Sequence, residues 1–328
     1  MPTTRPAKTD DIPQLTDLLL AGARRRHSAD PILWALAGNA HAEVAKALTH
    51  ALAAENQPFR QSWIVAREGT TLTGVAHTMS VPVPPIYAAE IPPGLILPDT
   101  TLTEDAPDGT LDALLDAAEA DLRAGGARTL LASHVPGDGL QTALNQRGYA
   151  SLTLYLSRTD LGDRDPARPV RPATDADIPG IVARSAEHRR IIAEIDPFWT
   201  THPEADTRFA AWMRRSLTLT DRDMLVTGAP EMQGYAIAQP ASRLHFPPSH
   251  PITGIGVIDD FYHTDLADPA HLADNGAGAA SLLCAAEAAL ARRGVGAAFV
   301  VCPAEWPSKV GLLHQAGYTT AMEWLVKR

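Results

Sequence analysis

Apolar positions along the 328-residue chain predict the same opening elements twice. Asp11 and Asp177 each precede Ile-Pro and a run of apolar residues at helical spacing. Each aspartate is therefore expected to cap a helix that has proline in its first turn. Strand-like apolar runs follow at 63–67 and 72–79 in the first half and at 224–227 and 234–238 in the second.

The second half continues with a clearer pattern. A strand-like segment at 254–263 is followed by a helix at about 278–293 and an apolar strand at 297–302. Helices, then an antiparallel meander, then a strand-helix-strand unit predict a mixed sheet flanked by helices, which is an α/β (α+β) fold.

Short repeated motifs relate the two halves. Arg5-Pro6-Ala7 recurs as Arg171-Pro172-Ala173, 166 residues later, and further motifs recur in the same order. A duplicated unit is the simplest explanation of such spacing. Residues 157–170 are polar and contain two prolines, which is typical of a linker. We therefore expect two domains, at 1–158 and 169–328.

Composition excludes several classes of protein. The chain has 28 Lys and Arg against 38 Asp and Glu, a net charge of -10. This charge disfavours general binding to nucleic acid or to an anionic membrane, which depends on Lys and Arg contacting phosphates. Cys284 and Cys302 are too few for a disulfide framework, and both are expected in the core. Without a signal peptide or an apolar spanning segment, the expected location is the cytoplasm. The histidines lack zinc-site spacing, so no metal is expected.

One segment suggests an anion site. It lies before the long predicted helix and reads Asn275, Gly276, Ala277, Gly278, Ala279, Ala280. Glycines let a ligand approach the backbone closely, and free N–H groups in the first turn of a helix attract phosphate. Small residues also occur where a helix simply packs tightly on a sheet. No Gly-Lys-Ser/Thr follows, so the segment is not a nucleotide P-loop.

The order of elements, this loop and the late Gly317-Tyr318 resemble the GNAT superfamily of N-acetyltransferases. The loop of that family has Gln or Arg, two residues, Gly, one residue, then Gly or Ala, and it binds the pyrophosphate of acetyl-CoA. Here Asn275 replaces the first residue, while Gly278 and Ala280 match the others. The resemblance covers nearly the whole chain as two GNAT-like domains in tandem, an arrangement similar to that of mycothiol synthase. It implies acetyl-CoA as cosubstrate of the second domain.

The matching turn of the first half, residues 107–112, has a different charge. Four acids lie in or beside it: Glu104, Asp105, Asp108 and Asp112. Two like charges about 4 Å apart repel by about 1 kcal/mol even in water. We therefore expect the first domain to be a degenerate copy that does not bind acetyl-CoA.

The strand before the glycine loop carries the candidate catalytic residues. Asp259 and Asp260 resemble the acids of relatives that acetylate glucosamine phosphate or aminoglycosides, and Phe261, Tyr262 and His263 match the residues whose backbone contacts the cofactor. An alkylamine is mostly protonated at neutral pH, so a base must remove a proton. Successive strand residues point to opposite faces, so both acids reach one substrate only across a bulge. We favour Asp260 as the base; alternatively both acids cap the strand end.

Some positions depart from the family pattern. The tyrosine that commonly acts as general acid is replaced by Leu144 in the first half and Leu313 in the second. Residues 264–274 form a longer connection than relatives have. Aromatic residues after the repeated Asp-Pro are expected to line an acceptor groove or to pack in the core: Trp34, Phe198, Trp199 and Trp212.

The sequence favours an acetyl-CoA-dependent N-acetyltransferase that acts on a primary amine of a small molecule, and an acidic protein suits a cationic acceptor. Two alternatives stay open. The missing tyrosines favour a non-catalytic acyl-CoA-binding or interaction module, and the acceptor amine could belong to a protein.

Overall fold

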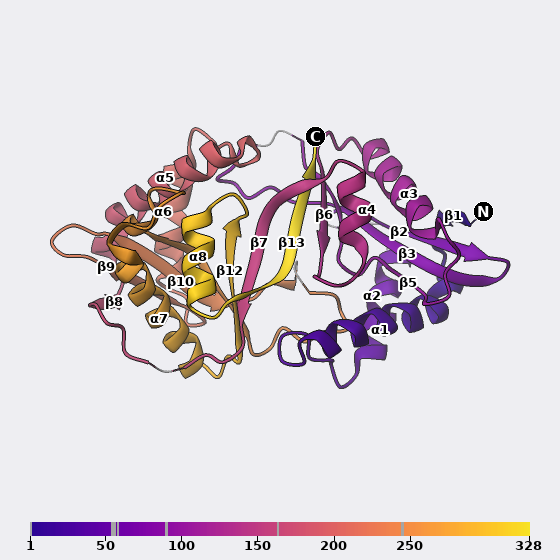
Figure 1. Ribbon diagram of the computed structural model, residues 1–328, viewed down its shortest axis with the longest axis horizontal. Helices are drawn as coiled ribbons and strands as arrows, with labels where there is room; N and C mark the ends of the chain where they lie inside the picture. Colours follow the sequence, from indigo (N-terminus) through magenta and orange to yellow (C-terminus); the bar gives the residue numbers. More distant parts are fainter. Residues whose placement is uncertain (1, 54–56, 58, 89–90, 163, 244–245) are drawn as a thin grey trace.

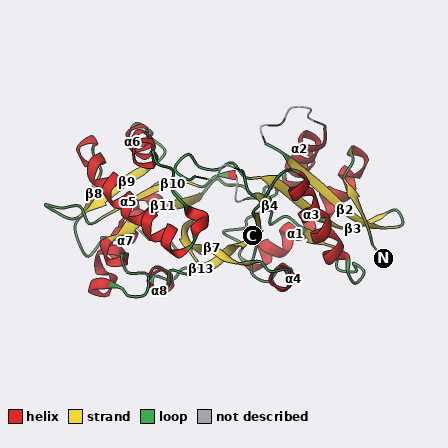
Figure 2. Ribbon diagram, turned by 90° about the horizontal axis from the view of Figure 1, so that it is seen from above, coloured by secondary structure: helices red, strands yellow, loops and turns green. Residues whose placement is uncertain are grey.

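The computed structural model describes residues 2–328, apart from 54–56, 58, 89–90, 163 and 244–245. Within these residues, thirteen strands form one mixed sheet with helices packed against both faces (Figures 1 and 2). The expected α/β (α+β) class is confirmed.

The first half contains, in order, β1 (Thr3–Pro6), α1 (Ile12–Ala29), α2 (Ala40–Ala53), β2 (Gln61–Glu68), β3 (Thr71–Ser80), β4 (Gly94–Ile96), β5 (Thr101–Leu102), α3 (Thr110–Ala124), β6 (Leu130–His134), α4 (Leu140–Gln146) and β7 (Ala150–Arg158). The second half contains β8 (Val170–Pro172), α5 (Ile178–Ile195), α6 (Ala205–Ser216), β9 (Asp223–Thr227), β10 (Gly234–Pro240), β11 (Ile255–His263), α7 (Ala277–Arg292), β12 (Ala297–Pro303), α8 (Pro307–Gln315) and β13 (Thr319–Lys327). The strands and the long helix expected from the sequence lie within two residues of these bounds.

The repeated Asp-Ile-Pro motif begins a helix in each half, as expected, but the aspartate side chain does not cap it. Asp177 is the N-cap residue of α5 and Asp11 that of α1, yet the Asp11 carboxylate makes no capping bond to its helix. It instead accepts the N–H group of Lys8 at 2.7 Å and binds the Arg5 guanidinium. Asp177 forms the same pair with Arg171 in the second half. The motif therefore closes the turn before each helix and ties it to the preceding strand.

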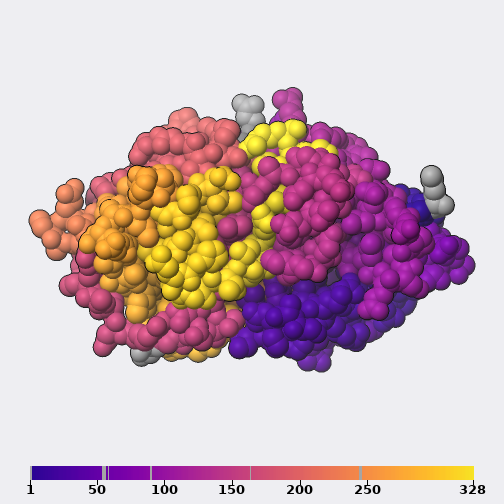
Figure 3. All heavy atoms as spheres, viewed as in Figure 1, coloured from indigo at the N-terminus to yellow at the C-terminus, as the bar shows by residue number. Residues whose placement is uncertain are grey.

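The order of strands joins the two halves more closely than a linker would. The sheet runs β1-β2-β3-β4-β6-β13-β7-β12-β11-β10-β9-β8. The last strand of the chain, β13, lies between β6 and β7 of the first half, and β7 pairs with β12 of the second. In Figure 3 the yellow surface of the C-terminal residues accordingly reaches into the magenta surface of the first half. Each half thus contributes its last strand to the shared centre of the sheet.

Two connections also cross between the halves. The β3–β4 connection of the first half reaches residues that follow α5, where Ala88 donates its N–H group to Thr200 and His202 donates to Ile86, both at 2.9 Å. The β10–β11 connection crosses in the opposite direction, and Ala37 donates to Ser249 at 2.9 Å. These reciprocal contacts fix the position of each half against the other.

Candidate active site

A bulge interrupts β11 at the two candidate acids. β11 pairs with β12 in parallel over Ile255–Ile258, and its register with β10 shifts between Tyr262 and Asp259. Asp260 lies in the bulge with a positive φ of 50°, a left-handed conformation that aspartate tolerates better than most residues. The bulge therefore breaks the alternation of side chains along β11 at Asp259 and Asp260, as the sequence analysis required if both acids are to reach one substrate.

Hydrogen bonds hold Asp259 in place. Its Oδ2 accepts the side-chain N–H of Gln239 at 2.9 Å, and its Oδ1 accepts the backbone N–H of Asp260 at 3.0 Å. Burial raises the pKa of the Asp259 carboxyl. The side chain lines a cavity between the two halves of the molecule.

Asp260 has the ionisation expected of a base. Burial, and then the neighbouring charge of Asp259, raise the pKa of Asp260 to about 7. The positive charges of Arg189 and Lys309 oppose this rise. A carboxyl group with a pKa near the working pH is well suited to general acid-base catalysis.

Lys309 is a buried cation that the sequence analysis missed. It lies in the first turn of α8 and is only 1% exposed. Its Nζ donates to the carbonyl oxygen of Phe261 at 2.7 Å and lies 5.1 Å from the ring centre of Trp306. Burial lowers the pKa of this lysine. Its position as a lone charge in a short apolar helix was the available sequence signal.

The residues expected to meet the cofactor through their backbone are buried. Phe261, Tyr262 and His263 are each at most 1% exposed. The backbone carbonyl oxygen of Phe261 already accepts a hydrogen bond from the Lys309 ammonium group. The Nδ1 of His263 accepts the N–H group of Asp265 at 3.0 Å, and burial lowers the pKa of its imidazole.

The glycine loop opens α7 as the sequence predicted. Asp274, Asn275 and Gly276 all have positive φ, and Ala277 begins the helix. A Cβ atom on Gly276 would lie 2.5 Å from the Leu312 side chain, and the positive φ of 71° also favours glycine there. Gly278 is equally restricted, since a Cβ would lie 2.2 Å from the His263 ring. Tight packing therefore accounts for the small residues at both positions.

Three N–H groups of this loop already donate to other residues, contrary to expectation. The carboxylate of Asp265 accepts the N–H groups of Gly278 at 2.8 Å and Ala279 at 3.1 Å, and Ala277 donates to Asp274. A pyrophosphate needs these same donors. The loop in this conformation therefore binds a carboxylate of its own chain.

Asp265 belongs to the long connection, residues 264–274, noted in the sequence. The connection is attached to α8, because Ser308 donates its N–H group to Pro269 at 2.8 Å and its hydroxyl to Asp268 at 2.9 Å. Trp306, at the start of α8, is fully buried and donates to the Ser308 hydroxyl. The connection thus covers the ends of β11 and α8.

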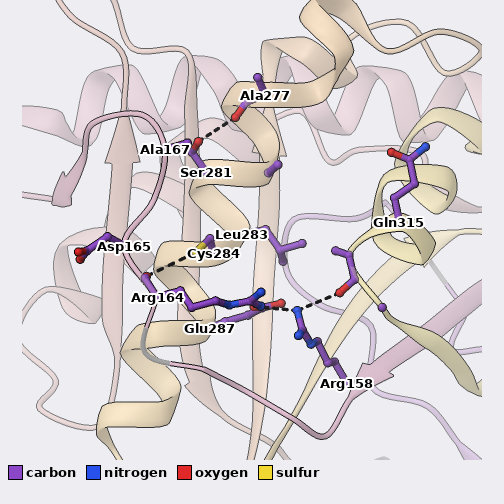
Figure 4. A pocket seen from close by; sticks show the side chains of 13 residues that line it. Arg158, Arg164, Asp165, Ala167, Ala277, Ser281, Leu283, Cys284, Glu287 and Gln315 are labelled. Atoms are coloured by element: carbon purple, nitrogen blue, oxygen red, sulfur yellow. Dashed lines mark hydrogen bonds and ion pairs between the residues drawn. The ribbon is translucent and has the colours of Figure 1, made fainter.

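A groove of about 610 Å³ runs along α7 beside the loop (Figure 4). Ala277 and Ala280 line it, as do Arg158 and Arg164. Glu287 is 3.3 Å from each arginine, so their charge is partly neutralised. Cys284 also lines this groove and is half-buried, which corrects its expected place in the core; Cys302 is fully buried as expected.

The cavity beside Asp259 measures about 290 Å³ and lies between the halves. Phe198 and Trp199, which the sequence placed either in a groove or in the core, line this cavity. Trp34 and Trp212 do not: Trp34 is buried against Phe246, and Trp212 is 43% exposed on α6.

The first half has a related arrangement. Asp99 lies three residues beyond Ile96, the last residue of β4 that pairs with β6, and Asp260 lies two residues beyond Ile258, the last residue of β11 that pairs with β12. Both oxygens of Asp99 lie 3.1 Å from Nδ1 of buried His77. Of the four acids near the first turn of α3, Asp112 binds Arg147.

Among the described residues, no group of three or more His, Cys, Asp or Glu side chains has the arrangement of a metal site. No helix in the same residues has the length and apolar character needed to cross a membrane.

No protein-family model matches the sequence, and neither does any curated protein. Solved structures share its fold. A GCN5-related N-acetyltransferase from Sphaerobacter thermophilus is 15% identical, with a TM-score of 0.57 over 99% of this chain and 95% of that one. A tandem GNAT protein from the clavulanic acid biosynthesis pathway is 14% identical, with a TM-score of 0.50 over 99% and 97%. A glucosamine N-acetyltransferase region of a fungal β-N-acetylglucosaminidase is 14% identical, with a TM-score of 0.50 over 99% of this chain and 38% of that one.

These likenesses define the architecture. The chain has the GNAT fold in tandem, as the order of motifs in the sequence implied.

Proposed function

We propose that this protein is an acetyl-CoA-dependent N-acetyltransferase that acetylates a primary amine of a small molecule. The tandem GNAT fold supports acyl transfer in general. The observation that carries the proposal is the carboxyl group of Asp260, with its pKa raised to about 7, in a bulge beside a cavity. We assign catalysis to the second half, in a cytoplasmic protein.

The two acids have separate roles in this proposal. Asp259 lines the cavity and receives the ammonium group of the acceptor, while Asp260 removes its proton. The free amine then attacks the carbonyl carbon of the thioester, and a C–N bond forms. As the C–S bond breaks, the nitrogen gives up its second proton, which passes through water to the thiolate, and CoA leaves as the thiol. Water returns the proton from Asp260 to solvent. A base that acts in this way typically contributes about 10²- to 10⁴-fold in rate.

Acetyl-CoA meets an obstacle at the loop of Asn275 to Ala280. Its pyrophosphate would take the N–H groups that Asp265 now occupies, and two anions do not share those donors. Binding to this loop therefore requires the carboxylate of Asp265 to move away. We keep the loop and the backbone of Phe261, Tyr262 and His263 as the proposed cofactor site on that condition.

A second candidate function rests on the same contact. If Asp265 stays on α7, the second half is a non-catalytic interaction module, which the leucine at position 313 also favours. Two measurements on the full chain separate the candidates. Titration calorimetry with acetyl-CoA tests binding, and thiol release with a panel of amines tests transfer.

We expect CoA release that depends on both acetyl-CoA and an amine, and that falls about 10²-fold in Asp260→Asn. No binding of acetyl-CoA, together with no release on any small amine or peptide amino terminus, would favour the interaction module, and binding without release would favour a non-catalytic acyl-CoA-binding module. Release with a peptide alone would move the acceptor to a protein.

A further inference from the structure

The cavity beside Asp259 is built by both halves of the chain. Val81 to Pro84 and Tyr87 come from the β3–β4 connection of the first half, and Phe198 and Trp199 come from the turn after α5. Pro93, at the end of the β3–β4 connection, adds to the wall of the first half, and the remaining walls come from strands in the centre of the sheet. Neither half encloses the cavity by itself.

Aromatic rings dominate its walls. They belong to Tyr87, Tyr155, Phe198, Trp199 and Trp324. The ring centres of Tyr87 and Trp199 are 5.3 Å apart, and those of Phe198 and Trp199 are 4.8 Å apart in an edge-to-face arrangement. Such walls favour a flat apolar body, and their faces attract a cation.

Asp259 is the only formally charged side chain among the described residues that line the cavity. Each of its oxygens accepts one hydrogen bond from the protein. A carboxylate has about four acceptor positions, so both oxygens can receive a further donor.

The contact between the halves holds Tyr87 in the wall of the cavity. Tyr87 forms a β-bridge with Thr201, and Arg208 donates to the carbonyl of Pro85 at 2.8 Å. Burial, followed by the charges of Asp260 and Asp259, raises the pKa of the Tyr87 hydroxyl. The phenol therefore stays neutral and lies within electrostatic range of both carboxylates.

From this geometry we infer that the cavity binds the acceptor and selects a monoamine with an aromatic or bulky apolar body, its ammonium group at Asp259. The inference rests on the proposed function and adds the substrate class and the role of the first half, which supplies Tyr87. A cavity of this volume suits a ligand of roughly ten to fifteen non-hydrogen atoms, since sites for drug-sized ligands begin at about 300 Å³.

The same walls select against polar amines. An amino sugar would bury several hydroxyl groups against apolar rings, and each hydroxyl without a partner weakens binding by roughly tenfold. A diamine would bring a second ammonium group into a cavity with one carboxylate. Both classes are therefore expected to bind poorly, whatever their reactivity in solution.

Binding is measured on the full chain by calorimetry, without acetyl-CoA, so that the result does not depend on turnover. The probes are 2-phenylethylamine, its neutral analogue 2-phenylethanol, glucosamine and putrescine. We expect 2-phenylethylamine to bind at least about 10-fold more tightly than each of the others. The neutral analogue lacks the charge pair with Asp259, which is worth roughly that factor or more, and glucosamine and putrescine would bury polar groups without partners.

Two variants test the assigned contacts. Asp259→Asn is expected to weaken the binding of 2-phenylethylamine about 10-fold or more. The affinity for 2-phenylethanol should stay within about twofold of wild type, which also shows that the cavity is intact. Trp199→Ala is expected to weaken both probes about 10-fold. Trp212→Ala is the matched control, because this tryptophan is exposed on α6 outside the cavity.

The inference is overturned if glucosamine or putrescine binds more tightly than 2-phenylethylamine, or if Asp259→Asn leaves the amine unaffected. It stands, while the proposed function fails, if the aromatic amine binds at Asp259 and no CoA is released with acetyl-CoA. If CoA is released only with polar amines, the proposed transferase function stands and the inferred substrate class is wrong.

Discussion

The carboxylate of Asp265 accepts the backbone N–H group of Gly278 at 2.8 Å, in the first turn of α7. A carboxylate at the N-terminus of a helix is stabilised by the free donors and by the positive end of the helix dipole. Phosphate is stabilised there for the same reasons. The long connection before α7 therefore carries a group that competes with the expected ligand of the loop.

Replacing Asp265 with asparagine separates the cap from its charge. The amide oxygen still accepts an N–H group, so the free energy of unfolding should change by less than about 1 kcal/mol. Loss of the negative charge should strengthen acetyl-CoA binding about 10-fold, because at least about 1 kcal/mol of repulsion is removed at 4 Å. Calorimetric titration of the full chain measures both acetyl-CoA and inorganic pyrophosphate.

The control for this variant is Asp268→Asn, since Asp268 lies in the same connection but binds the N–H group of Ala270. Asp268→Asn should leave the affinities for acetyl-CoA and inorganic pyrophosphate unchanged. Equal affinities for wild type and Asp265→Asn would show that the phosphate groups bind elsewhere.

The pH dependence of transfer should follow Asp260. Its raised pKa of about 7 means that the base form is lost as the pH falls below 7. The value of kcat/KM, measured with one acceptor amine, should therefore rise about tenfold per pH unit below pH 7 and level off above pH 7. Asp260→Asn should remove this limb from the profile, measured between pH 5 and 9. A limb that persists in the variant would assign the ionisation to another group.

The free energy of unfolding should also depend on the ionisation of Asp260, but it should fall as the pH rises. The folded-state pKa of Asp260 is raised above its unfolded value, so the folded protein binds more protons between about pH 4 and 7. Stability contributed by this carboxyl is therefore present at about pH 4 and is lost as the pH rises through 7. Asp260→Asn should accordingly have a higher Tm than wild type at pH 8 and nearly the same Tm at pH 4, measured by calorimetry. A lower Tm at pH 8 would contradict the assignment.

Lys309 should set the ionisation of Asp260 from a distance. Its buried positive charge lowers the pKa of the acid, although burial and Asp259 have larger effects in the opposite direction. Lys309→Met keeps the length of the side chain and removes the charge, so the acid limb of the activity profile should move to higher pH. Lys327→Met, whose ammonium binds Glu119 at 2.6 Å, is the matched control and should leave the limb in place. A structural role alone would lower activity without moving the limb.

The sequence predicted local features well and long-range contacts poorly. The duplicated Arg-Pro-Ala motif and the alternating apolar runs depend on nearby residues, and the corresponding strands and turns are present. Asp265 and Lys309 were missed because their partners lie 13 and 48 residues away in the chain. Tyr87 was missed for the same reason, since only the crossing of the β3–β4 connection brings it to the other half.

The exchange of β7 and β13 predicts how the two halves depend on each other. A cut in the linker between these halves leaves β7 paired with β12 and β13, so the cut chain should remain one complex. Either half expressed alone would lose strands from the centre of the sheet and expose unpaired edges, which favour aggregation. A protease site inserted between Arg158 and Val170 tests this by size-exclusion chromatography before and after cleavage. Co-elution of the two fragments, together with insolubility of each half expressed alone, is the expected result, whereas two soluble, folded fragments that separate would show that the halves are independent domains.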